Sequence, residues 1–327
     1  MDHKEIIDLL ERNYKILNES NAKWLDKRAK YLLARIFTGK KQILPLAEFD
    51  WLDTAFIHKS GLFTSFSKVT RYTLTGLMIS GQLNSVEGIE ELFFNKKILK
   101  DNGFKSSSAT YFAAYQLFLS KSERRTEIVQ RADRIYKEIK ALHPFITTTN
   151  DYSAVVSLAQ AEQLAHLSEE EICEIVEYYF EEFQGIGLKN RDSCLVASTL
   201  ATLMIGKKDW DFLAHLSSLI TFFENNQVKI KSLHFVPLVS LTYLKQQTDL
   251  VDLEELLVFM EEISKNISIY FESDYKESLA MSLYAESKSN SLSQTNVTTL
   301  SVSFNQIIVQ EQTMLASNAV ALINKNI

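Results

Sequence analysis

The sequence predicts an all-α fold, a right-handed α-solenoid-like stack of antiparallel helix pairs of the HEAT or armadillo type. Three observations predict it. The 327 residues include only nine glycines and three prolines, fewer than sheets, hairpins and α/β loops require. Apolar residues recur every three or four positions over long stretches. Nearly uncharged stretches alternate with charged ones, with a period of about 41 residues.

The first element is an amphipathic segment over residues 4–17, which we expect to cap one end of the stack. Its apolar residues are Ile6, Ile7, Leu10, Tyr14 and Leu17. Residues 22–60 have the same texture in weaker form and predict a degenerate helix pair.

Six nearly uncharged segments follow, and each predicts the inner helix of a pair. Their starts are separated by 37, 43, 41, 42 and 40 residues. One such pair cannot cover its own apolar faces, so neighbouring pairs must stack. The segments begin at Tyr72, Ala109, Tyr152, Ser193, Phe235 and Tyr275, and the last fits the pattern least well.

Charged amphipathic segments lie between them and predict outer helices with one buried stripe. In "SEEEICEIVEYYFEEFQGIG", Ser168 and Glu171 have the spacing of a capping box, which satisfies free backbone N–H groups. Gly103 and Gly187 suit the left-handed position after a helix. The expected stripe is Ile172, Ile175, Val176, Tyr179 and Phe183.

The C-terminal part is harder to assign. Residues 287–299 are polar and predict a loop, whereas 298–325 fit either a strand or a helix, of which we favour a closing helix. We therefore expect one helical-repeat domain over 1–327. It comprises the cap and degenerate pair in 1–70, the repeats in 71–286, and a loop and closing segment in 287–327.

The composition limits the cellular compartment that we expect for the protein and the classes of partner that it can bind. Cys173 and Cys194 lie in apolar helical segments, which favours a reducing compartment. No signal peptide is recognisable, and the uncharged stretch 193–206 is too short for a membrane span, so we expect a cytoplasmic protein without membrane contact. Residues 1–150 hold 24 Lys and Arg against 17 Asp and Glu, and residues 151–327 hold 11 against 24. The acidic overall balance argues against a general nucleic-acid binder.

No motif in the sequence carries catalytic chemistry. It has no GxSxG, no Gly-rich phosphate loop and no HExxH, and its six histidines show no metal-ligand spacing. We therefore predict no catalytic, cofactor-binding or metal residues, and no cofactor.

Two groups of residues are candidates for binding a partner. Tyr111 and Tyr115 lie one turn apart on an inner segment and either line a groove or belong to the core. The basic segment 121–142 either binds an anionic or protein partner or is an exposed helix whose charges pair internally. Its candidate residues are Arg124, Arg131, Arg134 and Lys137.

Three stretches carry a resemblance: "FIHKSGLFTSFSKVTRYTLTGLM" at 56–78, "HPFITTTNDYSAVVSLAQ" at 143–160 and "GLKNRDSCLVASTLATLM" at 187–204. Together with the length, they resemble a bacterial family of uncharacterised proteins, the domain of unknown function numbered four thousand and three. The resemblance implies a cytoplasmic bacterial helical protein with no assigned activity. The resemblance does not identify any functional residue in this sequence.

These observations favour a non-catalytic scaffold or regulator that binds a protein or peptide partner on its concave surface. The alternative is an enzyme or small-ligand sensor with a pocket between helices, which requires a deep pocket with at least two buried ionisable groups. A third hypothesis, a HEAT-like nucleic-acid protein, requires Lys and Arg of 96–140 to converge on one face. The sequence leaves the oligomeric state open.

Overall fold

The computed structural model describes residues 2–60, 67–267 and 273–289. In these ranges the chain forms fourteen α-helices and no strand, which confirms the all-α class. The predicted loop at 287–299 was wrong at its start, because residues 287–289 are the end of the last described helix, Ser273–Ser289. The rest of that loop and the predicted closing helix at 298–325 lie outside the described residues.

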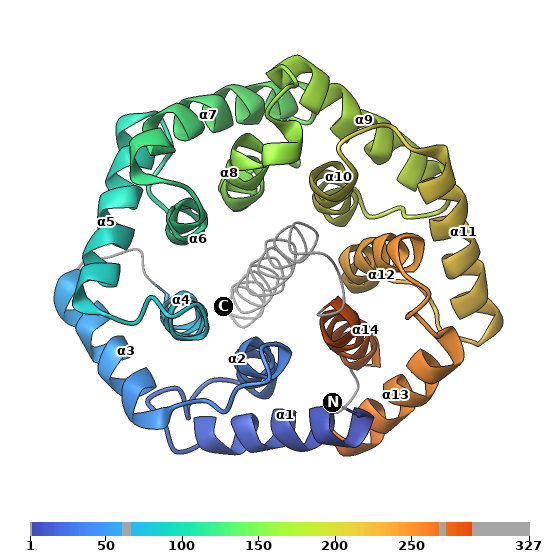
Figure 1. The fold of residues 1–327 in the computed structure, drawn as a ribbon, viewed down its shortest axis with the longest axis horizontal. Helices are drawn as coiled ribbons and strands as arrows, with labels where there is room; N and C mark the ends of the chain where they lie inside the picture. Colours follow the sequence, from blue (N-terminus) through green and yellow to red (C-terminus); the bar gives the residue numbers. More distant parts are fainter. Residues whose placement is uncertain (1, 61–66, 268–272, 290–327) are drawn as a thin grey trace, which may run out of the picture. The chain divides into compact units, whose positions relative to one another are not determined.

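Backbone contacts divide the chain into two compact units, with the boundary after Arg125. In the first unit, α1 and α2, α3 and α4, and α5 and α6 pack as pairs, and α4 contacts both α2 and α6 (Figure 1). The helices are α1 (His3–Leu17), α2 (Lys27–Gly39), α3 (Leu46–Ser60), α4 (Lys68–Ser80), α5 (Val86–Asp101) and α6 (Ser108–Gln116).

The second unit repeats this arrangement. Its pairs include α9 with α10, α11 with α12 and α13 with α14, while the even-numbered helices α8, α10, α12 and α14 contact one another in order (Figure 1). The helices are α7 (Arg125–Leu142), α8 (Tyr152–Gln160), α9 (Glu169–Gly185), α10 (Arg191–Ile205), α11 (Trp210–Asn225), α12 (Phe235–Gln247), α13 (Leu253–Asn266) and α14 (Ser273–Ser289). Short 3₁₀ segments are Leu117–Leu119 and Ser122–Arg124 in the first unit, and Thr149–Asp151, Glu162–Leu164 and Ser232–His234 in the second.

Even- and odd-numbered helices differ in how they are buried. The even-numbered helices from α4 to α12 contain the nearly uncharged segments, and α12 is buried at every position from Phe235 to Leu244. The odd-numbered helices bury one stripe, and in α9 all five expected stripe residues are buried. The cause is the charge pattern, because a helix without charged side chains can be covered on all sides.

Local signals set several helix ends as expected. Ser168 and Glu171 form the predicted capping box, with the Glu171 N–H donating to Ser168 Oγ at 3.1 Å and the Ser168 N–H to Glu171 Oε2 at 2.7 Å. Gly103 and Gly187 have φ angles of 97° and 108°, which L-residues with a side chain rarely adopt. These ends fix where each helix stops and the next begins.

Two further expectations concern burial. Cys173 and Cys194 are free and buried, as expected for small core residues. Burial raises the pKa of both thiols, that of Cys194 to about 11.

Within the described ranges, no helix combines the length and the apolar character that a membrane crossing requires.

Candidate functional site

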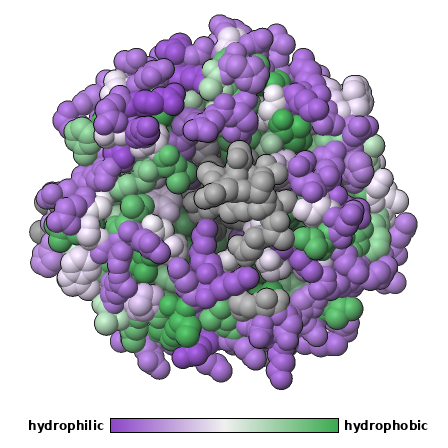
Figure 2. All heavy atoms as spheres, in the orientation of Figure 1, coloured by the Kyte–Doolittle hydropathy of each residue, from purple (hydrophilic) through white to green (hydrophobic). Residues whose placement is uncertain are grey.

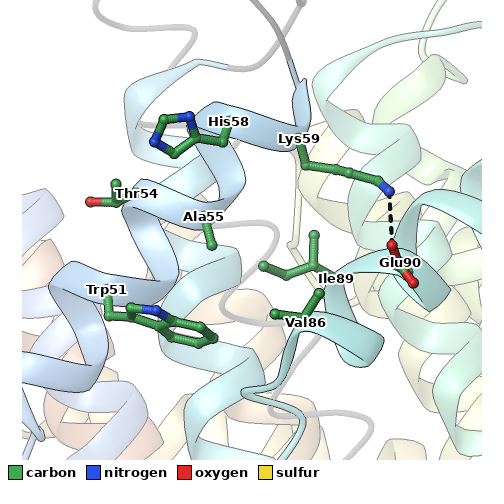
Figure 3. A pocket seen from close by; sticks show the side chains of 8 residues that line it. All are labelled: Trp51, Thr54, Ala55, His58, Lys59, Val86, Ile89 and Glu90. Carbon is green, nitrogen blue, oxygen red and sulfur yellow. Dashed lines mark hydrogen bonds and ion pairs between the residues drawn. The ribbon is translucent and has the colours of Figure 1, made fainter.

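An open groove of about 470 Å³ lies in the first unit, between α3 and α5 (Figure 3). Its volume falls within the range typical of ligand and side-chain binding pockets. Helix α3 contributes Trp51, Thr54, Ala55, His58 and Lys59, and helix α5 contributes Val86, Ile89 and Glu90.

The apolar part of the groove is exposed to solvent. The side chains of Val86 and Ile89 point towards the Trp51 indole across the space between the helices (Figure 3). Trp51 is 47% exposed and Val86 is 53% exposed, whereas Ile89 is buried at the base. An aromatic and an aliphatic side chain therefore stay in water beside a hollow that a partner's apolar group can fill.

The start of α5 depends on a tight turn. The Ser85 hydroxyl caps α5 by accepting a hydrogen bond from the Gly88 N–H at 3.0 Å. A Cβ atom at Gly88 would lie 2.2 Å from the Leu83 carbonyl oxygen, so only glycine permits this close approach. The turn places Val86 in the first turn of α5, opposite α3.

Charged groups lie at the rim and not at the base. Lys59 Nζ pairs with Glu90 Oε1 at 3.2 Å, and the two side chains are 44% and 60% exposed. His58 is also exposed. The groove therefore lacks the pair of buried ionisable groups that an enzyme or sensor pocket requires. No cluster of potential metal ligands is found in the described part of the chain.

Exposed hydrophobic residues alone do not define a site. Figure 2 shows hydrophilic side chains over most of the face in view, with hydrophobic residues in separate patches. Single exposed apolar residues of this kind are ordinary on protein surfaces. Trp51 and Val86 differ because they border the same hollow.

A family model described as a protein of unknown function, DUF4003, matches residues 13–313. The chain belongs to this family. The match confirms the resemblance inferred from the sequence, and it covers most of the chain. No curated protein and no solved structure matches this DUF4003 chain. The groove therefore has to be interpreted from its own chemistry.

The two tyrosines predicted to bind a partner lie on α6, outside the groove. Tyr111 is 0% exposed and packs edge-on against Phe93, with ring centroids 5.7 Å apart. Tyr115 is 7% exposed and its hydroxyl donates to the Leu77 carbonyl oxygen at 3.2 Å. Burial raises the pKa of both hydroxyls. Their role in partner binding stays a prediction.

The four predicted basic residues lie along the 3₁₀ segment before α7 and on α7 itself. Arg124 is exposed, and Lys137 pairs with Asp133 at 2.6 Å on the same helix. Arg134 pairs with Glu169 of α9 at 2.6 Å. Arg131 donates to the carbonyl oxygen of Ala159 near the end of α8 at 3.3 Å, and to those of Leu164 and Leu167 in the α8–α9 connection at 3.0 and 2.6 Å.

Arg131 and Arg134 thus hold α7 against the chain that leads into α9. This structural role accounts for their positions, and a role of the four residues in binding a partner stays a prediction.

The sequence did not point to the groove residues, although α3 contains a signal. Its buried stripe is Phe49, Leu52 and Phe56, whereas Trp51 and Ile57 are large apolar residues outside that stripe. Apolar residues outside the buried stripe of an amphipathic helix indicate a second contact surface.

Proposed function

We propose that this DUF4003 protein is a non-catalytic helical-repeat scaffold, with helix pairs stacked as an α-solenoid, that binds a protein partner. The groove between α3 and α5 carries the proposal, because it combines an exposed Trp51 and an exposed Val86 with an open, apolar hollow. Tryptophan is among the residues that contribute most to protein–protein affinity.

An amphipathic helix of the partner fits this groove best. The groove runs between two helices, and helix-in-groove recognition places successive apolar side chains of one helix into such a hollow. The exposed Lys59–Glu90 pair at the rim offers one charge of each sign to the flanking residues of the partner helix.

The burial of the even-numbered helices supports a partner site on the odd-numbered helices. Those helices are buried along most of their length, as at Phe235–Leu244 of α12 and at most positions of α10. The proposal therefore places the partner on the odd-numbered helices rather than on the concave surface that the sequence suggested.

The exposed positions of the ionisable groups favour a scaffold over an enzyme. His58, Lys59 and Glu90 all lie in contact with solvent. Catalytic acids and bases usually have environments that change their proton affinity, and such environments require burial or close charge partners in a cleft. The rim of the groove provides only one exposed ion pair, Lys59 with Glu90, among the groove residues, and no buried acid or base.

A matched pair of valines tests the proposal. Val86 and Val258 are both 53% exposed, but Val258 lies on α13 and does not line the groove. A photo-crosslinking amino acid is introduced at either position of the full-length chain in native cells. Mass spectrometry of the crosslinked peptides then identifies the segment that occupies the groove. We expect crosslinks to one amphipathic helical segment from position 86 and none to that segment from position 258.

Substitutions then test whether the groove is needed. Val86→Glu and Trp51→Ala are expected to lower the affinity for the captured segment at least tenfold, since truncation of a central aromatic contact costs about 2 kcal/mol. Val258→Glu is expected to bind as the wild type does. Equal crosslinking at the two positions, or full binding by both groove variants, contradicts the proposal.

A further inference from the structure

Helices α5 and α11 are equivalent elements of the two units. Ser85 caps the start of α5 and Asp209 caps the start of α11, 124 positions later in the chain. Directly after the two helices, Gly103 and Gln227 are also 124 positions apart, and both have positive φ angles, 97° and 63°. The buried residues of α5 correspond at the same spacing to buried residues of α11: Gly88, Ile89, Leu92, Asn95 and Leu99 to Phe212, Leu213, Leu216, Leu219 and Phe223. The two helices can therefore be compared residue by residue.

Helices α3 and α9 correspond in the same way. At the start of α3, the Phe49 N–H donates to the Pro45 carbonyl oxygen at 2.9 Å. At the start of α9, the Ile172 N–H donates to the Ser168 carbonyl oxygen at 3.1 Å. Counted from these starts, the buried residues of α3 correspond to buried residues of α9: Phe49, Leu52, Asp53 and Phe56 to Ile172, Ile175, Val176 and Tyr179. The pair α3 and α5 in the first unit is thus the counterpart of the pair α9 and α11 in the second.

The two pairs differ at the positions that border the groove. In the first unit these are Ala55 of α3 and Val86 of α5 (Figure 3). The corresponding residues of the second unit are Tyr178 of α9 and Trp210 of α11, and their rings pack edge-to-face with centroids 5.8 Å apart. Trp210 is 67% exposed, so this ring contact lies at the surface, as the groove does. Small side chains therefore leave open in the first unit a space that two aromatic rings occupy in the second.

We propose that the partner of this chain fills that space with an aromatic side chain, so that the occupant is an amphipathic helix with a Trp, Tyr or Phe anchor. The inference rests on the proposed function, which places a partner helix in the groove, and it adds the chemical class of the anchor. The anchor inserts beside Ala55 and Val86 and replaces the ring contact that Tyr178 and Trp210 make within the chain.

The lining of the groove favours a ring over an aliphatic side chain. The Trp51 indole is 47% exposed at its edge, where an incoming ring can take the edge-to-face arrangement that aromatic pairs prefer. Val86 and Ile89 supply apolar walls, and the Lys59–Glu90 ion pair stays at the rim. The polar atom of a Trp or Tyr anchor can therefore stay in water at the open side of the groove while its ring is buried.

Indole is the probe for the anchor. Methyl NMR spectra of the full-length protein follow Ala55, Val86 and Ile89 as indole is added, and isobutanol serves as the aliphatic control probe. We expect saturable ring-current shifts at these methyl groups and none at Val258, which is equally exposed as Val86 but does not line the groove. The affinity for isobutanol is expected to be at least tenfold lower. Equal affinity for the two probes, or no saturable response to indole, overturns the inference.

A filled variant, which combines Ala55→Tyr with Val86→Trp, tests the geometry. It copies the contact of Tyr178 with Trp210, so we expect it to fold and the response of the Ile89 methyl groups to indole to be lost. Val258→Trp is the control and is expected to keep the full response. An unchanged Ile89 response in the folded filled variant contradicts the inference. If that variant does not fold, the titration of the wild type decides.

The crosslinking experiment separates this inference from the proposed function. The segment crosslinked from position 86 is expected to carry an aromatic residue at the crosslink, and replacement of that residue by leucine is expected to lower the affinity at least tenfold. A segment that lacks an aromatic anchor, whether from another protein or from a second copy of this chain, overturns the inference and leaves the proposed function in place. If no segment is captured, the proposed function fails, and the indole titration still shows whether the groove selects aromatic groups.

Discussion

The Nε2 atom of His143 lies 2.6 Å from Oε2 of Glu177, and this hydrogen bond joins the residue after α7 to the middle of α9. The His143 side chain is 3% exposed and its ring packs on Phe180, with centroids 4.3 Å apart. The contact spans 34 residues of sequence and connects neighbouring helix pairs of the second unit.

Loss of the Glu177 carboxylate is therefore expected to destabilise the protein. Glu177→Ala leaves a buried imidazole N–H without its acceptor, which costs about 1–2 kcal/mol in free energy of unfolding. Urea denaturation measures the change. Glu174→Ala is the control, since its 70% exposed side chain has only a 3.7 Å contact with Lys208, and we expect at most about 0.5 kcal/mol. Equal losses for the two variants contradict this role.

Arg125 and Arg124 are neighbours in sequence with opposite environments. Arg125 is buried and donates to Asn95 Oδ1 at 3.0 Å and to the Leu117 carbonyl oxygen at 3.1 Å, and it pairs with Glu91 at 2.6 Å. Arg125→Ala leaves the buried Asn95 and Leu117 acceptors without this donor and is expected to cost about 3 kcal/mol. Arg124 is exposed, so Arg124→Ala is expected to stay within about 0.5 kcal/mol. Chemical denaturation of both variants gives the comparison, and a small loss for Arg125→Ala would count against the assigned role.

Asp151 gives the stability a pH dependence. Burial and repulsion by Asp192 raise its pKa to about 6, although a hydrogen bond from the Thr148 N–H at 2.7 Å partly opposes this. The ordinary pKa of Asp is about 3.9. The folded state therefore binds the proton more tightly than the unfolded state. The stabilisation of the folded state by protonated Asp151 is fully present below pH 4 and is lost as the pH rises through 6.

The variant Asp151→Asn does not titrate and keeps an oxygen that accepts from Thr148. Its stability relative to the wild type is expected to rise by about 2 kcal/mol between pH 4 and pH 7. Urea midpoints at several pH values measure the difference, in which the other titrating groups cancel. A difference that does not change with pH would show that the carboxyl is not destabilised by burial.

The two cysteines are expected to be inert in the folded protein. Cys173 and Cys194 are buried, and burial raises the pKa of both thiols, which keeps them protonated. With a chromogenic disulfide reagent at pH 8 we expect no reaction over an hour in native buffer and two thiols per chain in denaturant. Rapid reaction of either thiol in native buffer is the opposing result.

Much of the secondary structure follows from local patterns. The uncharged segments beginning near Tyr72, Ala109 and Phe235 became α4, α6 and α12 because such segments can be buried on all sides. The capping box of Ser168 and Glu171 also acts within four residues and depends on no other part of the chain.

The sites depend on contacts between distant residues. Arg131 resembled an exposed cation in the sequence, but in the folded chain it binds the carbonyl oxygens of Leu164 and Leu167. Trp51 and Val86 form a groove only because α3 lies beside α5.

The sequence by itself therefore determined the all-α class, the alternation of nearly uncharged and charged helices, and several helix ends. These properties depend on side-chain periodicity and on hydrogen bonds within one helical turn. Only the tertiary structure decided which apolar residues stay exposed beside a hollow, and which carbonyl oxygens Arg131 binds. Periodicity defines the faces of a helix, but only packing between helices determines what each face contacts.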